Sequence, residues 1–386
     1  MTNEILPMAF EQGPIRPPSE AQSLLLRFTR NCPWNRCTFC PIYKRQDFSR
    51  RSLQEIRQDI DAVRNIIDDL QALATRSGGL GTVTGEVVNR VLTTPGYSAC
   101  YRHVAVWHYH GKGTVFLQDA NSLVMRTPDL VAALRYLKEK VPGIQRITSY
   151  ARSSTVARKN LEELKEIRDA GLDRIHIGLE SGSDRVLEFV RKGASARQHI
   201  EAGQKIVAAG MTLSEYIMPG LGGAVWSREH ALETARVLNA IDPHFIRIRS
   251  LRVPPRSPLF EDVQEQRLQL LSDDQVVEEI RLLIESLDGI HSTLTSDHIM
   301  NLLEEVEGTL PGDKARMIAA VDRYLALPAQ EKLLFRLARR GGAVRSLDDL
   351  NDPSLRARLE RAMVQLRADA GGDLEKVITE LGDQYI

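Results

Sequence analysis

Three of the four cysteines stand close together near the N-terminus, and this group has the clearest chemical potential in the sequence. The segment NCPWNRCTFC (residues 31–40) carries Cys32, Cys37 and Cys40 in the pattern C-x4-C-x2-C. Thiolates are soft ligands that suit iron–sulfur clusters, zinc and copper(I). Because three thiolates on one short loop can face a single point, the spacing predicts a metal or redox site rather than a disulfide framework.

The number of thiolates leaves the kind of metal open. Structural zinc normally takes four protein ligands, and His108 and His110, two residues apart, could point to one face of a strand and supply the fourth. A [4Fe–4S] cluster is normally held by four cysteines, so three would leave one iron with an open position. An open iron can bind a substrate or cofactor, which favours chemistry over a structural role. The fourth cysteine, Cys100, is expected to be an ordinary buried side chain.

Short apolar segments that alternate with amphipathic stretches must position this loop. We predict strands at residues 24–30, 114–118, 144–150, 173–180, 211–220 and 244–251, with helices between them, the first at 52–75. About six strand–helix units in a row indicate a parallel sheet with right-handed crossovers. Periodicity alone does not separate an open doubly wound sheet from a barrel.

The chain is predicted to have three parts. Residues 1–21 form a proline-rich arm, and residues 22–265 form the α/β core, in which a weakly patterned segment at about 77–112 is an insertion. Residues 266–386 form a helical C-terminal region, which includes a predicted helix over TSDHIMNLLEEVEG (295–308).

Two segments carry a resemblance to a known superfamily. The cysteine loop resembles the signature of the radical S-adenosylmethionine (SAM) enzymes, commonly C-x3-C-x2-C with an aromatic residue before the last cysteine; Phe39 holds that place, and one extra residue separates Cys32 from Cys37. The segment RIHIGLESGSDRVL (174–187), followed by Lys192 and Gly193, resembles the fourth-strand motif shared by anaerobic coproporphyrinogen oxidases, tRNA methylthiotransferases and elongator-type radical enzymes. The resemblance covers roughly residues 22–260 and implies a partial (β/α)6 barrel of the TIM type.

The resemblance also implies a reaction. Cys32, Cys37 and Cys40 would ligate three irons of a [4Fe–4S] cluster, and SAM would chelate the fourth. One electron would then cleave SAM to a 5′-deoxyadenosyl radical that abstracts hydrogen from substrate. An electron donor such as flavodoxin or ferredoxin is expected. The alternatives are a non-catalytic zinc or iron–sulfur protein and an electron carrier.

Five further residues are expected at the cofactor. The resemblance places Phe39 near the adenine of SAM. Asp119 follows the second strand and could accept hydrogen bonds from the amino group of SAM. Arg152, after the third strand, could hold the carboxylate of SAM. Glu180 and Ser181 end the fourth strand, where a carboxylate suits the ribose hydroxyls.

Catalytic residues are unknown, and the candidates are Glu215 and Tyr216 on the fifth strand and Arg249, which alternates with Arg247 on the sixth. Residues 23–51 hold seven Arg or Lys against one acid, and residues 245–257 hold four Arg and no acid. This excess would either balance the cluster and SAM or bind an anionic substrate such as a tetrapyrrole, a phosphate ester or tRNA. Because no RNA-binding module is apparent, a small molecule is favoured over tRNA.

Composition excludes several other classes. Lys+Arg and Asp+Glu are both 51, so the formal net charge of zero gives no support to nucleic-acid binding through the overall field. Neither an 18-residue apolar run nor a signal peptide occurs, so we expect a cytoplasmic protein with no membrane partner. Methylthiolation and cobalamin-dependent chemistry are not expected, because extra N-terminal cysteines and a flavodoxin-like domain are missing from this sequence.

Overall fold

The computed structural model describes residues 8–369 and 371–383. Within this part of the chain, eight strands form one sheet in the order β1-β4-β5-β6-β7-β8-β9-β10, and every described pairing is parallel except β9 with β10. Its strands are β1 (Leu24–Arg27), β4 (Thr114–Gln118), β5 (Arg146–Ala151), β6 (Leu172–Glu180), β7 (Thr212–Ile217), β8 (Phe245–Ile248), β9 (Thr293–Thr295) and β10 (Gly308–Thr309). This mostly parallel α/β arrangement is consistent with the predicted partial TIM-type barrel.

The chain divides into two compact units. The first comprises the segment ending at Asn35, Ile42–Ile177 and Lys205–Leu213, and the second comprises Arg36–Pro41, Gly178–Gln204 and the segment from Ser214 onward. The division falls inside the cysteine loop, so Cys32 belongs to the first unit and Cys37 and Cys40 to the second. The predicted boundaries near residues 21 and 265 stay predictions.

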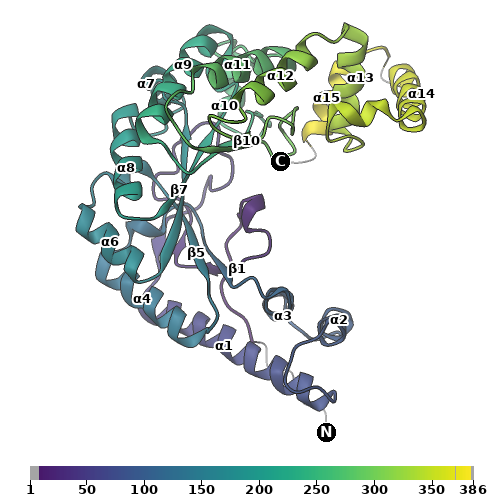
Figure 1. Cartoon of the computed structure of the whole chain (residues 1–386). Helices are drawn as coiled ribbons and strands as arrows, with labels where there is room; N and C mark the ends of the chain where they lie inside the picture. Colours follow the sequence, from purple (N-terminus) through teal and green to yellow (C-terminus); the bar gives the residue numbers. More distant parts are fainter. Residues whose placement is uncertain (1–7, 370, 384–386) are drawn as a thin grey trace. The chain divides into compact units, whose positions relative to one another are not determined.

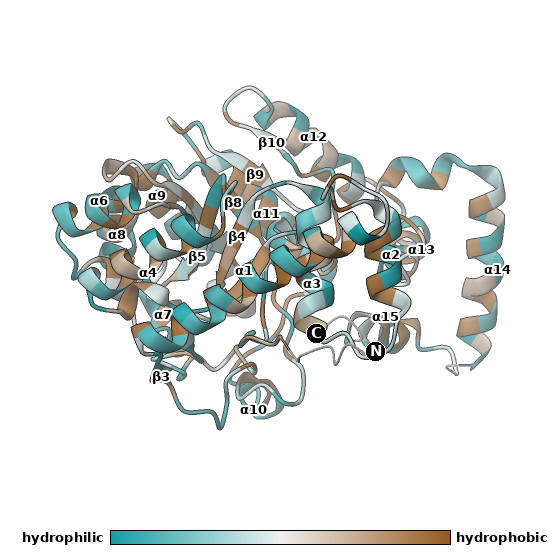
Figure 2. Cartoon of the chain, turned by 90° about the horizontal axis from the view of Figure 1, so that it is seen from below, coloured by the Kyte–Doolittle hydropathy of each residue, from teal (hydrophilic) through white to brown (hydrophobic). Residues whose placement is uncertain are grey.

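Several helices of the first unit pack against one another. The unit contains α1 (Leu53–Arg76), α2 (Gly85–Thr93), α3 (Ala99–His110), α4 (Thr127–Lys140), α5 (Ser153–Val156) and α6 (Leu161–Asp169), and α4 packs against α1 and α6 (Figure 1). The predicted first helix is confirmed: Ser52 and Glu55 form a capping box at its start. Its buried residues include Ile56, Ile60, Val63 and Ile67, which recur at helical spacing, and its ribbon carries both hydrophobic and hydrophilic residues (Figure 2).

The segment predicted as an unpatterned insertion at 77–112 holds two helices, α2 and α3. Thr84 and Ser98 cap their N-termini through side-chain oxygens, and α3 ends at Gly111, whose φ of 65° is left-handed. His108 and His110 therefore lie on a helix, and the strand placement on which the zinc alternative depended is wrong. Residues two apart on a helix do not share a face.

The described part of the N-terminal arm, residues 8–21, packs within the first unit. Phe10 is buried, its amide donates to Sγ of Cys100 at 3.5 Å, and its carbonyl accepts from the same thiol at 3.2 Å. Gln118, at the end of β4, bonds both the amide and the carbonyl of Gly13. Cys100 is thus a buried side chain, as expected, with backbone partners at Phe10, and residues 8–21 of the arm are part of this unit.

The second unit contains most of β7 and all of β8 to β10. Its helices are α7 (Asp184–Phe189), α9 (Gly223–Ile241), α10 (Leu259–Gln264), α11 (Asp273–Ser286), α12 (Lys314–Leu325), α13 (Ala329–Arg340), α14 (Pro353–Asp369) and α15 (Leu374–Asp383), while α8 (Ala196–Ala208) begins in the second unit and ends in the first. Helix α11 packs against α9 and α12, and α13 packs against α14 and α15 (Figure 1). The C-terminal region is therefore largely helical, as predicted.

One predicted helix of this region is wrong. Residues 295–308 form the end of β9, a long loop and the start of β10. The buried side chain of Asn301 accepts from the amide of Ser250 at 3.0 Å and donates to the carbonyl of Ile248 at 2.8 Å. These bonds hold the loop against the end of β8, so tertiary contacts outweigh the helical spacing of the apolar residues.

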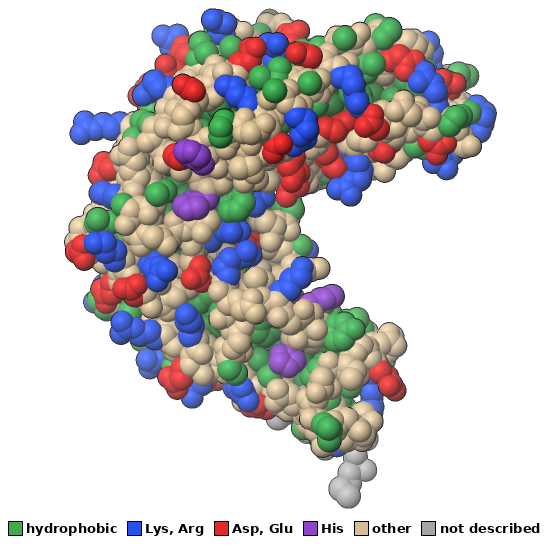
Figure 3. All heavy atoms as spheres, viewed as in Figure 1, with side chains coloured by type: hydrophobic (Ala, Val, Ile, Leu, Met, Phe, Trp, Pro, Cys, Tyr) green, Lys and Arg blue, Asp and Glu red, His purple; other side chains and the backbone are tan. Residues whose placement is uncertain are grey.

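Among the described residues, no helix is both long and apolar enough to cross a membrane. Basic and acidic side chains are interspersed over the face shown in Figure 3, in keeping with the balanced composition.

Candidate functional site

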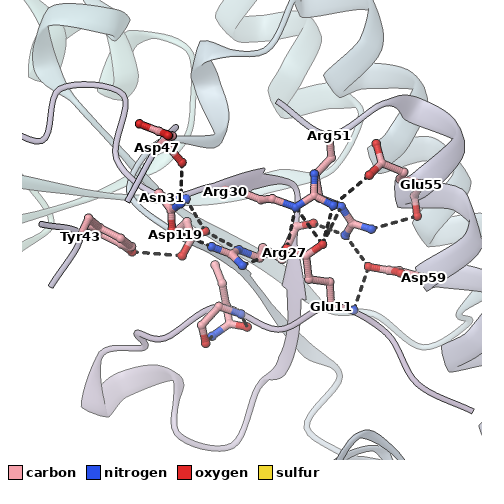
Figure 4. A network of polar contacts seen from close by, with 12 residues as sticks. Glu11, Arg27, Arg30, Asn31, Tyr43, Asp47, Arg51, Glu55, Asp59 and Asp119 are labelled. Carbon is pink, nitrogen blue, oxygen red and sulfur yellow. Dashed lines mark hydrogen bonds and ion pairs between the residues drawn. The ribbon is translucent and has the colours of Figure 1, made fainter. Parts of the chain in front are cut away.

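The start of the cysteine loop is fixed in the first unit by Asp119, which follows β4. Its carboxylate is fully buried and accepts from Nε of Arg27 at 2.5 Å, from the amide of Asn31 at 2.8 Å and from the hydroxyl of Tyr43 at 3.1 Å (Figure 4). Asn31 directly precedes Cys32, and its φ of 66° lies in the left-handed region. Asp119 therefore holds a strained residue next to the first cysteine, and its carboxylate already has three donors.

Glu11 of the N-terminal arm neutralises a group of arginines around this point. Its carboxylate pairs with Arg27 at 2.9 Å, Arg30 at 2.6 Å and Arg51 at 3.5 Å (Figure 4). Asp59 also pairs with Arg51. Three of the seven cations that make residues 23–51 basic are thus matched by acids, so the excess seen in the sequence overstates the charge offered to an anionic substrate.

The second half of the loop is fixed in the second unit through the backbone of Thr38. Its amide donates to the carbonyl of Val190 at 3.0 Å. Its carbonyl accepts from the amide of Leu259 at 2.9 Å and from the hydroxyl of Ser257 at 2.8 Å. Thr38 lies between Cys37 and Cys40, so these bonds set the path of the chain that carries both thiols.

Phe39 is half-buried and packs against an apolar cluster of four side chains in the second unit. The cluster comprises Val186, Val190, Met218 and Leu221. This packing anchors the loop, so the aromatic residue before the last cysteine has a structural role whether or not it also contacts adenine.

Lys192 connects several of these elements within the second unit. Its carbonyl oxygen lies 3.9 Å from Sγ of Cys37, and its ammonium lies 5.7 Å from the ring centroid of Phe39 and 2.8 Å from Oε1 of Glu180. Lys192 belongs to the motif that begins at Arg174, and the motif alone predicts no role for it. Its position twelve residues after Glu180 in the same motif is the signal that could have found it.

Glu180 ends β6 in a conformation that non-glycine residues rarely adopt. Its φ is 61°, and such a conformation costs about 1–3 kcal/mol. Its side chain is 12% exposed, and its carbonyl accepts from the amide of Met218 at 3.0 Å. Asp119 has a similar φ of 67° at the end of β4. Two acids thus occupy left-handed positions just where parallel strands end.

Ser181 is fully buried and belongs to an internal hydrogen-bond network. Its Oγ accepts from the amide of Ser183 at 3.1 Å and lies 2.8 Å from Nδ1 of His230. Nε2 of His230 lies 3.1 Å from the carbonyl of Met218, which can only accept, so Nε2 carries the proton and Nδ1 accepts from Ser181. Burial lowers the pKa of His230, in keeping with this neutral form. The structure thus gives the Ser181 hydroxyl two protein partners.

The network continues to Glu279 on α11. One of its oxygens accepts from the amide of Gly220 at 2.7 Å and the other from the hydroxyl of Ser227 at 2.5 Å. His230 lies 3.6 Å from the same carboxylate. Glu279 therefore fixes the loop that follows β7.

The candidate catalytic residues do not line one surface. Alternation along β7 places Glu215 and Tyr216 on opposite faces. Glu215 is fully buried, and within the described residues neither carboxylate oxygen has a hydrogen-bond partner. Burial raises its pKa well above the ordinary value, while Lys192 lowers it less. Arg247 is buried and donates to Oγ of Ser214 at 3.1 Å, whereas Arg249 lies beyond β8 and is exposed.

Arg152 lies at the end of β5 in the first unit. Its guanidinium is 5.0 Å from the ring centroid of Trp34, which belongs to the cysteine loop. This is the geometry of a cation–π contact. Arg152 therefore lies against the loop and keeps a charge beside it.

The cysteines present a donor set that fits an iron–sulfur cluster. Cys32, Cys37 and Cys40 are half-buried thiols outside any disulfide. In the described part of the chain, no three His, Cys, Asp or Glu side chains converge on a single ion. A four-iron cluster does not need that convergence, because each thiolate binds a different iron.

Residues 99–235 match the model of the Radical SAM superfamily. The chain carries a radical SAM domain. The matched segment runs from α3 to α9 and includes Glu180, Lys192 and Glu215, whereas the cysteine loop precedes it. The resemblance inferred from two motifs is thereby confirmed at the level of the superfamily.

Several solved structures align with the chain at low sequence identity. An N-terminally truncated archaeal Elp3 from Methanocaldococcus infernus is 14% identical over 55% of this chain and 53% of that chain, with a TM-score of 0.40. Methylornithine synthase (PylB) is 15% identical over 72% and 67%, with a TM-score of 0.41. The cobalamin-dependent SAM radical enzyme OxsB is 14% identical over 93% and 58%, with a TM-score of 0.45. The alignments thus span little more than half of Elp3 and OxsB. No curated protein matches the chain.

Proposed function

We propose that the chain is a radical SAM enzyme in which Cys32, Cys37 and Cys40 each bind one iron of a [4Fe–4S] cluster and SAM binds the fourth. The observation that carries this proposal is the loop itself, which holds three thiols within nine residues and precedes the segment, beginning at residue 99, that matches the superfamily model. When bound, the cluster and SAM supply a one-electron reductive cleavage whose 5′-deoxyadenosyl radical abstracts hydrogen from a substrate.

In this proposal Asp119 and Thr38 position the cysteine loop. Asp119 holds Asn31 beside Cys32, and the backbone of Thr38 fixes the segment between Cys37 and Cys40. A role for Asp119 in binding the amino group of SAM is less well supported, because three protein donors already surround its buried carboxylate.

Glu180 and Lys192 are proposed to bind SAM together. Lys192 donates to Oε1 of Glu180, which leaves Oε2 to accept from a ribose hydroxyl. The strained backbone of Glu180 supports a functional assignment, because such strain is often retained where a side chain must be aimed. Arg152 remains the proposed partner of the SAM carboxylate, since an arginine matches a carboxylate in geometry and charge.

The substrate is proposed to be a small molecule, and an electron donor such as flavodoxin or ferredoxin would supply the electron. Of the candidate catalytic residues, Arg249 is proposed to bind an anionic group of the substrate, which its exposure supports. Glu215 and Tyr216 lie on opposite faces of β7, so at most one of them is proposed to face the substrate. Burial raises the pKa of Glu215 well above its ordinary value, which favours the protonated carboxyl, and that form can donate a hydrogen bond.

The test is anaerobic. The protein is reconstituted with iron and sulfide, SAM and dithionite are added, and 5′-deoxyadenosine is measured by mass spectrometry. Wild type and Cys100→Ser should form it, whereas Cys37→Ser should not; Cys100→Ser is the matched control because Cys100 lies outside the loop and has its own backbone partners. Tightly bound zinc in place of iron, or a cluster that never yields 5′-deoxyadenosine, would contradict the proposal and favour a structural metal or an electron carrier.

A further inference from the structure

The second unit contains a cavity of about 250 Å³ at the carboxyl ends of three neighbouring strands. Gly220 follows β7, Ser250 follows β8 and Ser296 follows β9, and all three residues line the cavity. The pairings of β7 with β8 and of β8 with β9 are parallel. Ligands of folds with parallel strands bind at the carboxyl ends of those strands. The position of the cavity therefore favours a ligand site over a packing defect.

The walls of the cavity are mostly apolar. They come from the loop after β8, from α10 and α11 and from the loop between β9 and β10. The apolar side chains include Leu251, Val253, Phe260, Val276, Ile280 and Leu303. Such walls favour an apolar occupant, because its binding removes apolar surface of both molecules from water.

The uncharged polar side chains of the lining bond to the protein itself. Asn301 accepts from the amide of Ser250 at 3.0 Å and donates to the carbonyl of Ile248 at 2.8 Å. The hydroxyl of Ser296 donates to the carbonyl of Leu303 at 2.7 Å. These bonds shape the walls and already use the donors and acceptors that a polar ligand would need.

The charged side chains of the lining pair with one another. Asp273 accepts from Arg340 at 2.9 Å and lies 3.8 Å from Arg252. Arg340 also donates to the carbonyl of Met300 at 2.8 Å. Because an acid and two arginines neighbour each other here, an ion of either sign would have to compete with an existing pair. An uncharged ligand does not meet this cost.

We propose that this cavity binds a small uncharged apolar group, either a compact ring or a short branched chain. An apolar cavity of about 150 Å³ is enough to bind benzene, so the volume suits such a group. Binding rests on the walls of the second unit alone and does not depend on the proposed radical chemistry.

Packing connects the cavity to the second half of the cysteine loop. Leu251 lines the cavity and also packs on the apolar cluster that anchors Phe39. Phe260 lines the cavity next to Leu259, whose amide donates to the carbonyl of Thr38. An occupant would therefore contact Leu251 and Phe260 beside the points at which this half of the loop is anchored.

The proposal is tested by calorimetric titration of the full-length protein with toluene and with two ions that keep its ring, benzoate and benzylammonium. Toluene should bind with a dissociation constant below about 1 mM. Each ion should bind at least about tenfold more weakly, because it would lose its hydration in an apolar site. Val276→Phe, which fills the cavity, should abolish toluene binding. Val225→Phe makes the same exchange on α9 at a position that is 77% exposed and should leave the affinity unchanged.

A failure of toluene to bind, an ion that binds as tightly as toluene, or unchanged binding by Val276→Phe would overturn the proposal. Should Val276→Phe fail to fold, photolabelling of the wild type with phenyl-trifluoromethyldiazirine, an uncharged aryl probe, replaces it. Crosslinks within residues 250–260, 270–280 or 296–306 that toluene suppresses would support the site. Crosslinks that toluene leaves unchanged, or that are confined to other segments, would refute it.

Discussion

Replacing Asp119 by asparagine tests whether this carboxylate positions the cysteine loop or binds SAM. The side chain is fully buried and has three donors, one of them the charged guanidinium of Arg27. A hydrogen bond to a charged group contributes about 1.5–3 kcal/mol. Asparagine keeps one acceptor oxygen and turns an amide NH2 toward at least one donor. Because Glu11 still pairs with Arg27, we expect the free energy of unfolding to fall by about 2–4 kcal/mol.

The assay is urea denaturation of the apoprotein followed by circular dichroism, together with iron content after anaerobic reconstitution. We expect Asp119→Asn to lose both stability and iron, because Asn31 adjoins Cys32. Asp129→Asn is the matched control, since its carboxylate pairs with Arg126 at the protein surface and should contribute little. If Asp119→Asn kept wild-type stability and iron content but bound SAM more weakly, the positioning role would be refuted.

Three further substitutions test the remaining contacts. Lys192→Met leaves Glu180 without its cation, so the dissociation constant for SAM should rise about tenfold at unchanged iron content; equilibrium dialysis that shows no change would contradict this. His103 on α3 accepts from the amide of Leu25 at 3.1 Å. Burial lowers the pKa of His103 to about 4, so its neutral form stabilises the fold above pH 6.5 and this stability is lost as pH falls toward 4. Relative to His103→Gln, wild type should lose about 3 kcal/mol over that range in urea titrations, and parallel pH profiles would exclude the effect. Glu279→Ala leaves the Gly220 amide unpaired and should lower the free energy of unfolding by about 2–4 kcal/mol; a wild-type urea midpoint would refute that network.

Local sequence predicts the strands well and the irregular segments poorly. The strand at 114–118 has the predicted bounds, because a continuous apolar run follows Gly113. Helices α2 and α3 were missed because they are short and glycine and threonine are frequent in the segments that flank them, although Thr84 and Ser98 are good cap residues. The helix predicted at 295–308 failed because Asn301 bonds the chain around Ser250, a contact between segments about fifty residues apart.

The site could be predicted as far as its chemistry lies in local motifs. The thiols follow from the spacing of Cys32, Cys37 and Cys40. The roles of Glu11 and Asp119 could not be read from the sequence, because their partners Arg30 and Asn31 lie 19 and 88 residues away in the chain. The basic excess of residues 23–51 overestimated the positive charge for the same reason. The acids that pair with its arginines, such as Glu11 and Asp59, lie outside residues 23–51.

The most direct test of the central claim is electron paramagnetic resonance of the reconstituted, dithionite-reduced protein, recorded with and without SAM. We predict the signal of a reduced [4Fe–4S] cluster that changes its g-values when SAM is added, because SAM would bind the iron that the three cysteines leave open. The signal should be retained in Cys100→Ser and be lost in Cys37→Ser. A cluster signal that SAM leaves unchanged, or one that survives in Cys37→Ser, would contradict the account.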